Sequence, residues 1–122
     1  MTAYNRFVNK TLAQLDVTIA PLADTKFNRA KSWLKPLEYA ALGVPFVASP
    51  TPEYERFGRD PCLGLYASRP RDWAAMLRLL KDPGWRATAS DAGRDAVRRL
   101  HTVEGNAWRW AEAWALAAEN GP

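Results

Sequence analysis

The chain has 122 residues and a formal net charge of +4 at pH 7, with 48% hydrophobic and 25% charged residues. This length and composition are typical of one globular domain. No apolar run approaches the roughly 20 residues that a membrane-spanning helix needs, so we expect no transmembrane segment. Much of the positive excess is arginine between Arg69 and Arg99, interleaved with aspartates. That pattern favours solvated helix faces over a nucleic-acid surface, and no groove-reading motif for nucleic acid is present.

Cysteine content and the amino-terminal sequence both indicate the cytoplasm. The stretch MTAYNRFVNK lacks the apolar core and cleavage site of a signal peptide. Cys62 is the only cysteine, so it cannot form an internal disulfide, and we interpret it as structural. One cysteine and one histidine, His101, cannot supply four ligands, so we expect no zinc site.

The first half of the chain reads as a strand, a loop and a helix. Residues 15–22 form a short β-branched run closed by Pro21, which is typical of a buried strand. Residues 23–34 mix Asp, Thr, Asn, Lys and Ser, which predicts a polar loop. A helix is expected over about residues 35–42, because Pro36 suits a first helical turn.

The end of that helix and the next strand are marked by glycine and proline. Gly43 is placed to end the helix, and Pro45 prevents its return. Residues 44–48 are short and apolar, as expected for a strand covered on both faces. Strand, helix and strand in this order predict a parallel crossover unit over residues 15–49.

The second half of the chain reads as mainly helical. Trp73, Met76, Leu77 and Leu80 recur at helical spacing, and the Asp82-Pro83-Gly84 sequence ends that pattern. The other expected elements are a short helix at 53–57, a third strand at 63–67, a helix at 89–100 with Val97 and Leu100 inward, and a last helix capped by Thr102 and running to about 118. The fold class is therefore α/β, a partial Rossmann-like parallel sheet with a helical tail over 69–118. We expect one domain over 1–122, and an incomplete one, because open parallel sheets usually have more strands.

The stretch KSWLKPLEYAALGVPFVAS, residues 31–49, contains the candidate site. Ligands of open α/β sheets bind beyond the carboxyl ends of the strands, where the loop after Pro21 and the start of the helix are expected to meet. Lys31, Ser32 and Lys35 would add charge and a hydroxyl to the free N–H groups of that helix end, a suitable site for a diphosphate. Glu38 lies one turn further on and could accept hydrogen bonds from a ribose diol, or could instead complement the helix dipole or pair with a lysine.

The order and spacing of these residues resemble the donor-binding, C-terminal domain of GT-B-fold retaining glycosyltransferases of group 1. The resemblance runs from about residue 15 to residue 114, and the block at 31–49 is its specific part. Its matching residues are Asp16, Val17, Pro21, Lys31, Ser32, Lys35, Glu38, Tyr39, Ala41, Gly43, Pro45, Val47, Ala48, Ser49, Pro52, Glu53 and Tyr54.

The resemblance implies a role for the site residues. In the family, the glutamate matching Glu38 binds the ribose of a nucleotide-sugar, and residues matching 30–35 contact the diphosphate and the sugar. Many members carry another glutamate eight positions earlier, where this chain has Ala30. The implied donor is a UDP- or GDP-sugar, with no metal or other cofactor. The family's acceptor site lies on an N-terminal domain, so we expect this chain to lack catalysis unless such a domain or a partner protein supplies the acceptor site.

Several alternatives stay open from the sequence. The chain could be a non-catalytic α/β interaction module rather than part of a hexosyltransferase. Asp24, Thr25 and Asn28 could touch a donor sugar, although turn formation is the favoured interpretation. Trp108, Trp110 and Trp114 could form a stacking platform, although we expect them to pack, and His101 is expected to cap a helix or lie at the surface.

Overall fold

A computed structural model of the chain describes residues 3–58 and 64–120. Helices predominate, and three short strands form the sheet. The elements in chain order are α1 (Ala3–Lys10), η1 (Leu12–Gln14), β1 (Thr18–Ala20), α2 (Lys26–Arg29), α3 (Leu34–Leu42), β2 (Phe46–Ala48), α4 (Pro52–Gly58), β3 (Leu65–Tyr66), α5 (Pro70–Leu79), α6 (Pro83–Leu100) and α7 (Val103–Glu119). Cys62 and the start of the expected third strand lie outside the described residues.

The sheet is parallel with the strand order β1-β2-β3, which confirms the predicted crossover unit. Val47 at the centre of β2 pairs with Ile19 on one side and with Leu65 on the other. All three residues of β2 are buried, as a strand covered on both faces requires. β1 is shorter than the predicted 15–22 and is not fully buried, because Ile19 is 52% exposed while its neighbours point into the core.

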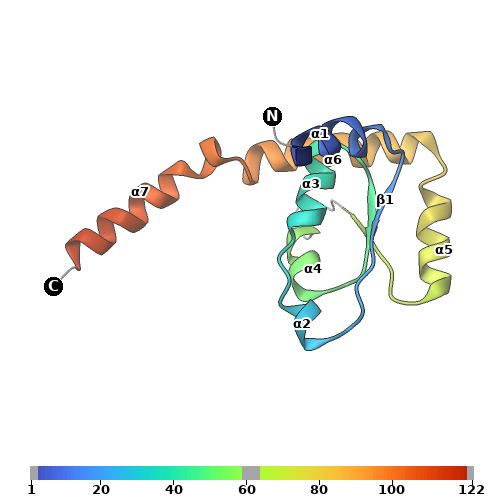
Figure 1. Ribbon diagram of the computed structural model, residues 1–122, viewed down its shortest axis with the longest axis horizontal. Coiled ribbons are helices and arrows are strands. Elements are labelled where there is room, and N and C mark those ends of the chain that lie inside the picture. Colours follow the sequence, from blue (N-terminus) through green and yellow to red (C-terminus); the bar gives the residue numbers. More distant parts are fainter. Residues whose placement is uncertain (1–2, 59–63, 121–122) are drawn as a thin grey trace.

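Helices cover both faces of the sheet, and each face has its own apolar cluster. On one face α3, α4 and α6 pack around Phe46, with Tyr39, Tyr54 and Phe57 as its largest partners. On the other face Val47 packs with Leu80 and with side chains of α5. Figure 1 shows α3 and α4 on one side of β1 and α5 on the other. This two-faced covering is the Rossmann-like arrangement expected from the alternation of strands and helices.

Helix α3 begins and ends close to where its sequence predicts. Pro36 lies in the first turn and is buried, where its missing N–H leaves no intrahelical bond unmade. Gly43 ends the helix in the left-handed conformation, with φ of 70°. Its N–H bonds to the carbonyl of Ala40 at 2.9 Å, and the N–H of Val44 bonds to that of Tyr39 at 2.9 Å, so the last turn is closed by a glycine cap.

Three local predictions are wrong. The loop at 23–34 contains the single helical turn α2, because the Thr25 side chain caps it by accepting from the N–H of Asn28. Helix α6 begins at Pro83 rather than at 89, because Asp82 caps it and proline is favoured in a first turn. Leu100 is exposed instead of facing inward, whereas Val97 packs against the core as predicted, beside the buried small residues Gly93 and Ala96.

The last helix extends away from the body of the molecule, as Figure 1 shows. Thr102 caps it as predicted, its hydroxyl accepting from the N–H of Gly105 at 3.1 Å. The expected packing of its tryptophans against the chain is wrong: Trp108, Trp110 and Trp114 are 59%, 64% and 70% exposed. The physical reason is that α7 diverges from α6, so that Val103 and Trp110 border an open cavity beside Trp33 and Leu37 and do not enter the core.

Candidate functional site

Two neighbouring cavities lie at the carboxyl ends of the strands, where parallel sheets bind their ligands. The first has a volume of about 350 Å³, and we call it the lysine cavity. It is lined by Ile19, Ala20, Pro21, Leu22, Lys31, Ser32, Leu34, Lys35 and Tyr54. The loop after Pro21 and the first turn of α3 therefore meet, as the sequence predicts, and three of the four predicted site residues share this cavity.

The lysine cavity combines two cations with the amino end of a helix. None of its lining residues is acidic. Among the described residues no side chain caps α3, so the first-turn N–H groups of Leu34 and Lys35 are available to a ligand. The ammonium group of Lys31 lies 5.3 Å from the centre of the Phe27 ring, a cation–π contact that leaves it exposed to solvent. Charge and dipole both favour an anion here.

Glu38, the fourth predicted residue, does not line this cavity. It lies one helical turn beyond Lys35 and is partly buried. The hydroxyl of Tyr4, on α1, donates a hydrogen bond to its Oε1. This bond, with burial and the carboxylate charge, raises the pKa of the Tyr4 phenol. Within the described residues no ion pair joins Glu38 to either lysine, so the lysine-pairing alternative has no support in the geometry.

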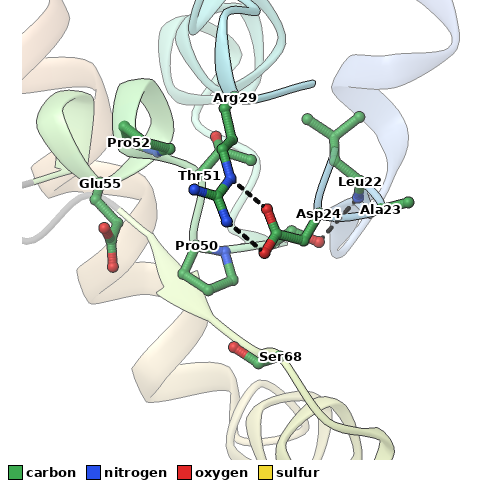
Figure 2. A pocket seen from close by; sticks show the side chains of 10 residues that line it. Leu22, Ala23, Asp24, Arg29, Pro50, Thr51, Pro52, Glu55 and Ser68 are labelled. Atoms are coloured by element: carbon green, nitrogen blue, oxygen red, sulfur yellow. Dashed lines mark hydrogen bonds and ion pairs between the residues drawn. The ribbon is translucent and has the colours of Figure 1, made fainter. Parts of the chain in front are cut away.

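The second cavity has a volume of about 490 Å³ and is shown in Figure 2. We call it the Asp24 cavity. It touches the loops after all three strands and shares Leu22 with the lysine cavity. Its lining residues are Leu22, Ala23, Asp24, Arg29, Ser49, Pro50, Thr51, Pro52, Glu55 and Ser68. Hydroxyl groups and charges of both signs make it suited to a polar, hydroxylated ligand.

An ion pair fixes one wall of the Asp24 cavity. Arg29 donates from Nε and Nη2 to the two carboxylate oxygens of Asp24, at 2.6 and 2.8 Å, and Figure 2 shows the two groups facing each other. The bond from Arg29 lowers the pKa of Asp24, and the same bond raises the pKa of Arg29. Thr25 and Asn28 form the turn beside this pair, and the Asn28 amide donates to the carbonyl of Ala23 at 2.9 Å. Their contacts are those of turn formers, the favoured interpretation.

Sequence reasoning missed four residues near the site. Arg29 and Glu55 lie on helices α2 and α4, Ser68 follows β3, and Tyr4 lies on α1. The signal for Ser68 was available, because the carboxyl ends of parallel strands meet at one edge. Nothing in the local pattern around Tyr4 indicates its contact with Glu38, which spans 34 positions of the chain.

His101 and possible metal ligands complete the survey of reactive side chains. The His101 ring packs against Phe57 and Trp33, with ring centres 5.2 and 6.4 Å apart. Burial, and to a smaller extent the charge of Arg109, lowers its pKa. Within residues 3–58 and 64–120, no group of three or more His, Cys, Asp or Glu side chains is arranged to hold a metal ion. His101 is therefore a packing residue, and it lines neither of the two cavities at the strand ends.

The comparison with known families decides the relationship that this geometry suggests. A family described as glycosyl transferase-like matches residues 2–112. The chain belongs to this family. The match covers the strand-helix-strand unit, both cavities and most of the helical tail of this glycosyl transferase-like chain. It confirms the resemblance seen over residues 15–114 and the Rossmann-like fold predicted from the unit at 15–49. No curated protein and no solved structure matches the chain.

The described part of this glycosyl transferase-like chain contains no candidate membrane-spanning helix. None of its helices combines the length and the apolar character that crossing a bilayer requires.

Proposed function

We propose that this glycosyl transferase-like chain binds the donor of a glycosyl transfer reaction, a nucleoside-diphosphate sugar. The diphosphate would lie in the lysine cavity, against Lys31, Ser32, Lys35 and the amino end of α3. Glu38 would accept hydrogen bonds from the ribose. The observation that supports this most is the meeting of two lysines and an uncapped helix end in a cavity lined by no acidic residue.

Electrostatics explain why such a cavity suits this donor. The leaving nucleoside diphosphate gains negative charge as the sugar–oxygen bond breaks, and fixed positive charge stabilises that change. The two ammonium groups and the α3 dipole supply it without a metal ion. Ser32 adds a hydroxyl donor at the same helix end.

The positions of Glu38 and the two cavities also support one orientation of the bound donor. Glu38 lies beyond Lys35 along α3, and the Asp24 cavity adjoins the lysine cavity at Leu22. A donor with its ribose near Glu38 and its diphosphate in the lysine cavity would extend its sugar towards the Asp24 cavity. Many members of the family have a glutamate at the position of Ala30. The hydroxyl groups that line the Asp24 cavity could make the sugar contacts of that missing glutamate.

The second part of the proposal concerns catalysis. The contacts described above all concern the donor. We propose that transfer requires an acceptor site supplied by another domain or by a partner protein. The chain by itself would then bind nucleotides without transferring sugar.

Calorimetry with UDP, GDP and ADP tests the donor site. At least one should bind with a dissociation constant of about a millimolar or better. Glu38→Ala should weaken that binding by about tenfold or more, because charge-assisted hydrogen bonds to the ribose are lost. Lys35→Ala should weaken it similarly and reduce its dependence on salt.

Two control variants make the calorimetric result specific. Glu112→Ala removes an exposed carboxylate on α7 and should leave binding unchanged. Tyr4→Phe removes only the hydroxyl bonded to Glu38, so binding should be no weaker. Absence of binding by all three nucleotides, or an equal loss in Glu112→Ala, would refute the donor site and favour the non-catalytic interaction module.

A further inference from the structure

Phe27 is a large apolar side chain in an exposed position beside Lys31. It is 75% exposed, whereas the phenylalanines Phe46 and Phe57 are 1% and 3% exposed. Apolar side chains are stabilised by burial, so packing in the core does not explain this position. The Phe27 ring instead has a cation as its partner, because the Lys31 ammonium nitrogen lies 5.3 Å from the ring centre.

The backbone around α2 brings the two side chains together. The N–H of Ala30 donates to the carbonyl of Phe27, and the N–H of Lys31 donates to that of Asn28, each at 3.2 Å. The helical turn therefore continues beyond α2 as far as Lys31. Residues four apart on such a turn lie on the same side, so the contact between Phe27 and Lys31 follows from the local backbone.

Side-chain contacts fix this turn in place. Thr25 caps it by accepting from the N–H of Asn28 at 3.1 Å, and the Asn28 amide donates back to the main chain at 2.9 Å. The two bonds from Arg29 to Asp24 join the ends of the turn. A ring carried by a fixed turn offers a preorganised surface, so Phe27 can orient a side chain that is itself flexible.

An aromatic ring differs from a carboxylate as the partner of a cation. Attraction to the face of a ring orients an ammonium group but leaves its charge and most of its N–H donors available. Within the described residues no ion pair involves Lys31, whereas the neighbouring Arg29 is paired with Asp24 at 2.6 Å. Lys31 therefore keeps its full charge for a ligand.

The two lysines of the lysine cavity differ in how they are held. Lys35 lies in the first turn of α3, so the helix backbone fixes its position. Lys31 lies between α2 and α3, outside any helix or strand. Immobilising a flexible lysine against a ligand costs side-chain entropy, and a contact formed before binding reduces that cost. Among the described residues no cation–π contact involves Lys35, so the ring contact is particular to Lys31.

We propose that Phe27 is a positioning residue for the donor: its ring holds the Lys31 ammonium group at the lysine cavity, where it meets the diphosphate. The inference rests on the proposed function of that cavity. Phe27 acts through Lys31 rather than by touching the donor. Its effect therefore depends on the aromatic character of residue 27, which a merely structural role does not require.

Calorimetry with whichever of UDP, GDP and ADP binds tightest tests the proposal. Phe27→Leu keeps the apolar bulk but removes the ring, and it should weaken binding about two- to fivefold, the size expected of an exposed cation–π contact. Phe27→Trp should bind at least as tightly as the wild type, because tryptophan is the best cation–π partner. In a Lys31→Ala background, Phe27→Leu should cause no further loss.

A matched control and a nucleotide-free measurement make the result specific. Trp108→Leu removes a cation–π contact of the same 5.3 Å distance, with Arg109 on α7, and should leave nucleotide binding unchanged. Proton NMR of the free protein detects the Phe27 contact directly, because the ring current shifts the signals of nearby Lys31 protons. Phe27→Leu should remove that shift and leave the circular dichroism unchanged, since Phe27 is exposed.

The outcomes separate this inference from the proposed function. Failure of all three nucleotides to bind the wild type would refute both. Wild-type affinity in Phe27→Leu would overturn the positioning role alone, as would a wild-type spectrum without the ring-current shift. An equal loss in Phe27→Leu and Phe27→Trp, or a loss that persists in the Lys31→Ala background, would also overturn it, because neither depends on the cation–π contact.

Discussion

Glu38 illustrates how a single residue can be placed correctly and still have an unforeseen partner. Its position in the first half of α3, one turn beyond Lys35, follows from the sequence. The hydrogen bond from Tyr4 does not, because α1 carries no local signal for where it packs. Tyr4 occupies one carboxylate oxygen, so a ribose would have to use the other or displace the phenol.

His101 gives a prediction for stability against pH. Burial lowers its pKa in the folded state below the usual 6.5, so the unfolded chain binds the proton more readily. The stability that neutral His101 contributes is fully present above pH 6.5 and is lost as pH falls towards its folded pKa. We expect urea unfolding of the wild type to show decreasing stability from about pH 7.5 to about pH 5.

His101→Phe is the matched variant for this measurement. Phenylalanine keeps a ring against Phe57 and Trp33 but cannot titrate. Its unfolding free energy should vary less with pH over the same interval. An identical slope in both proteins would show that groups other than His101 carry the dependence.

At the scale of elements, the close contact between α3 and α6 depends on glycine. A Cβ built at Gly93 would lie 3.3 Å from both the Cα and the carbonyl oxygen of Ala40. Both atoms belong to a backbone that cannot turn aside, so the two helices approach through small residues. This contact holds α3, and with it the lysine cavity, against the rest of the domain.

Gly93→Leu should therefore destabilise the fold. Overpacking of this kind costs about 1–3 kcal/mol, and urea denaturation measures it as a lower midpoint. Ala87→Leu is the control, because Ala87 lies exposed on the same helix and a leucine there should change stability by no more than about 0.5 kcal/mol. Equal losses in both variants would contradict the close-packing argument.

Elements were predictable where the sequence carries its own start or stop signal. Gly43 and Thr102 define the end of α3 and the start of α7, and both act as expected. The Asp82-Pro83-Gly84 sequence ends one helical pattern, but it also begins the next helix, because Asp is a good N-cap and Pro suits a first turn. The predicted start of α6 at 89 is therefore too late. The exposure of the α7 tryptophans depends on where the helix points, which amphipathic spacing does not determine.

For the whole molecule, the parallel sheet explains why distant residues share one site. Loops after β1, β2 and β3 meet at the carboxyl edge, so the lysine cavity could be anticipated from strand order. The Asp24 cavity could be anticipated only in part, because Arg29 and Glu55 depend on the short helices α2 and α4. Cytoplasmic location and dependence on a further acceptor domain stay predictions from the sequence.

The most direct test of the donor site is an NMR titration of ¹⁵N-labelled protein with UDP, GDP and ADP. The tightest-binding nucleotide should shift the amide signals of Lys31, Ser32, Leu34 and Lys35 along one saturating curve, because their N–H groups and side chains surround the proposed diphosphate position. Glu38→Ala should raise the nucleotide concentration needed for half-saturation, while the same four amide signals should still shift. Shifts confined to other parts of the chain, or none at saturating nucleotide, would contradict the account.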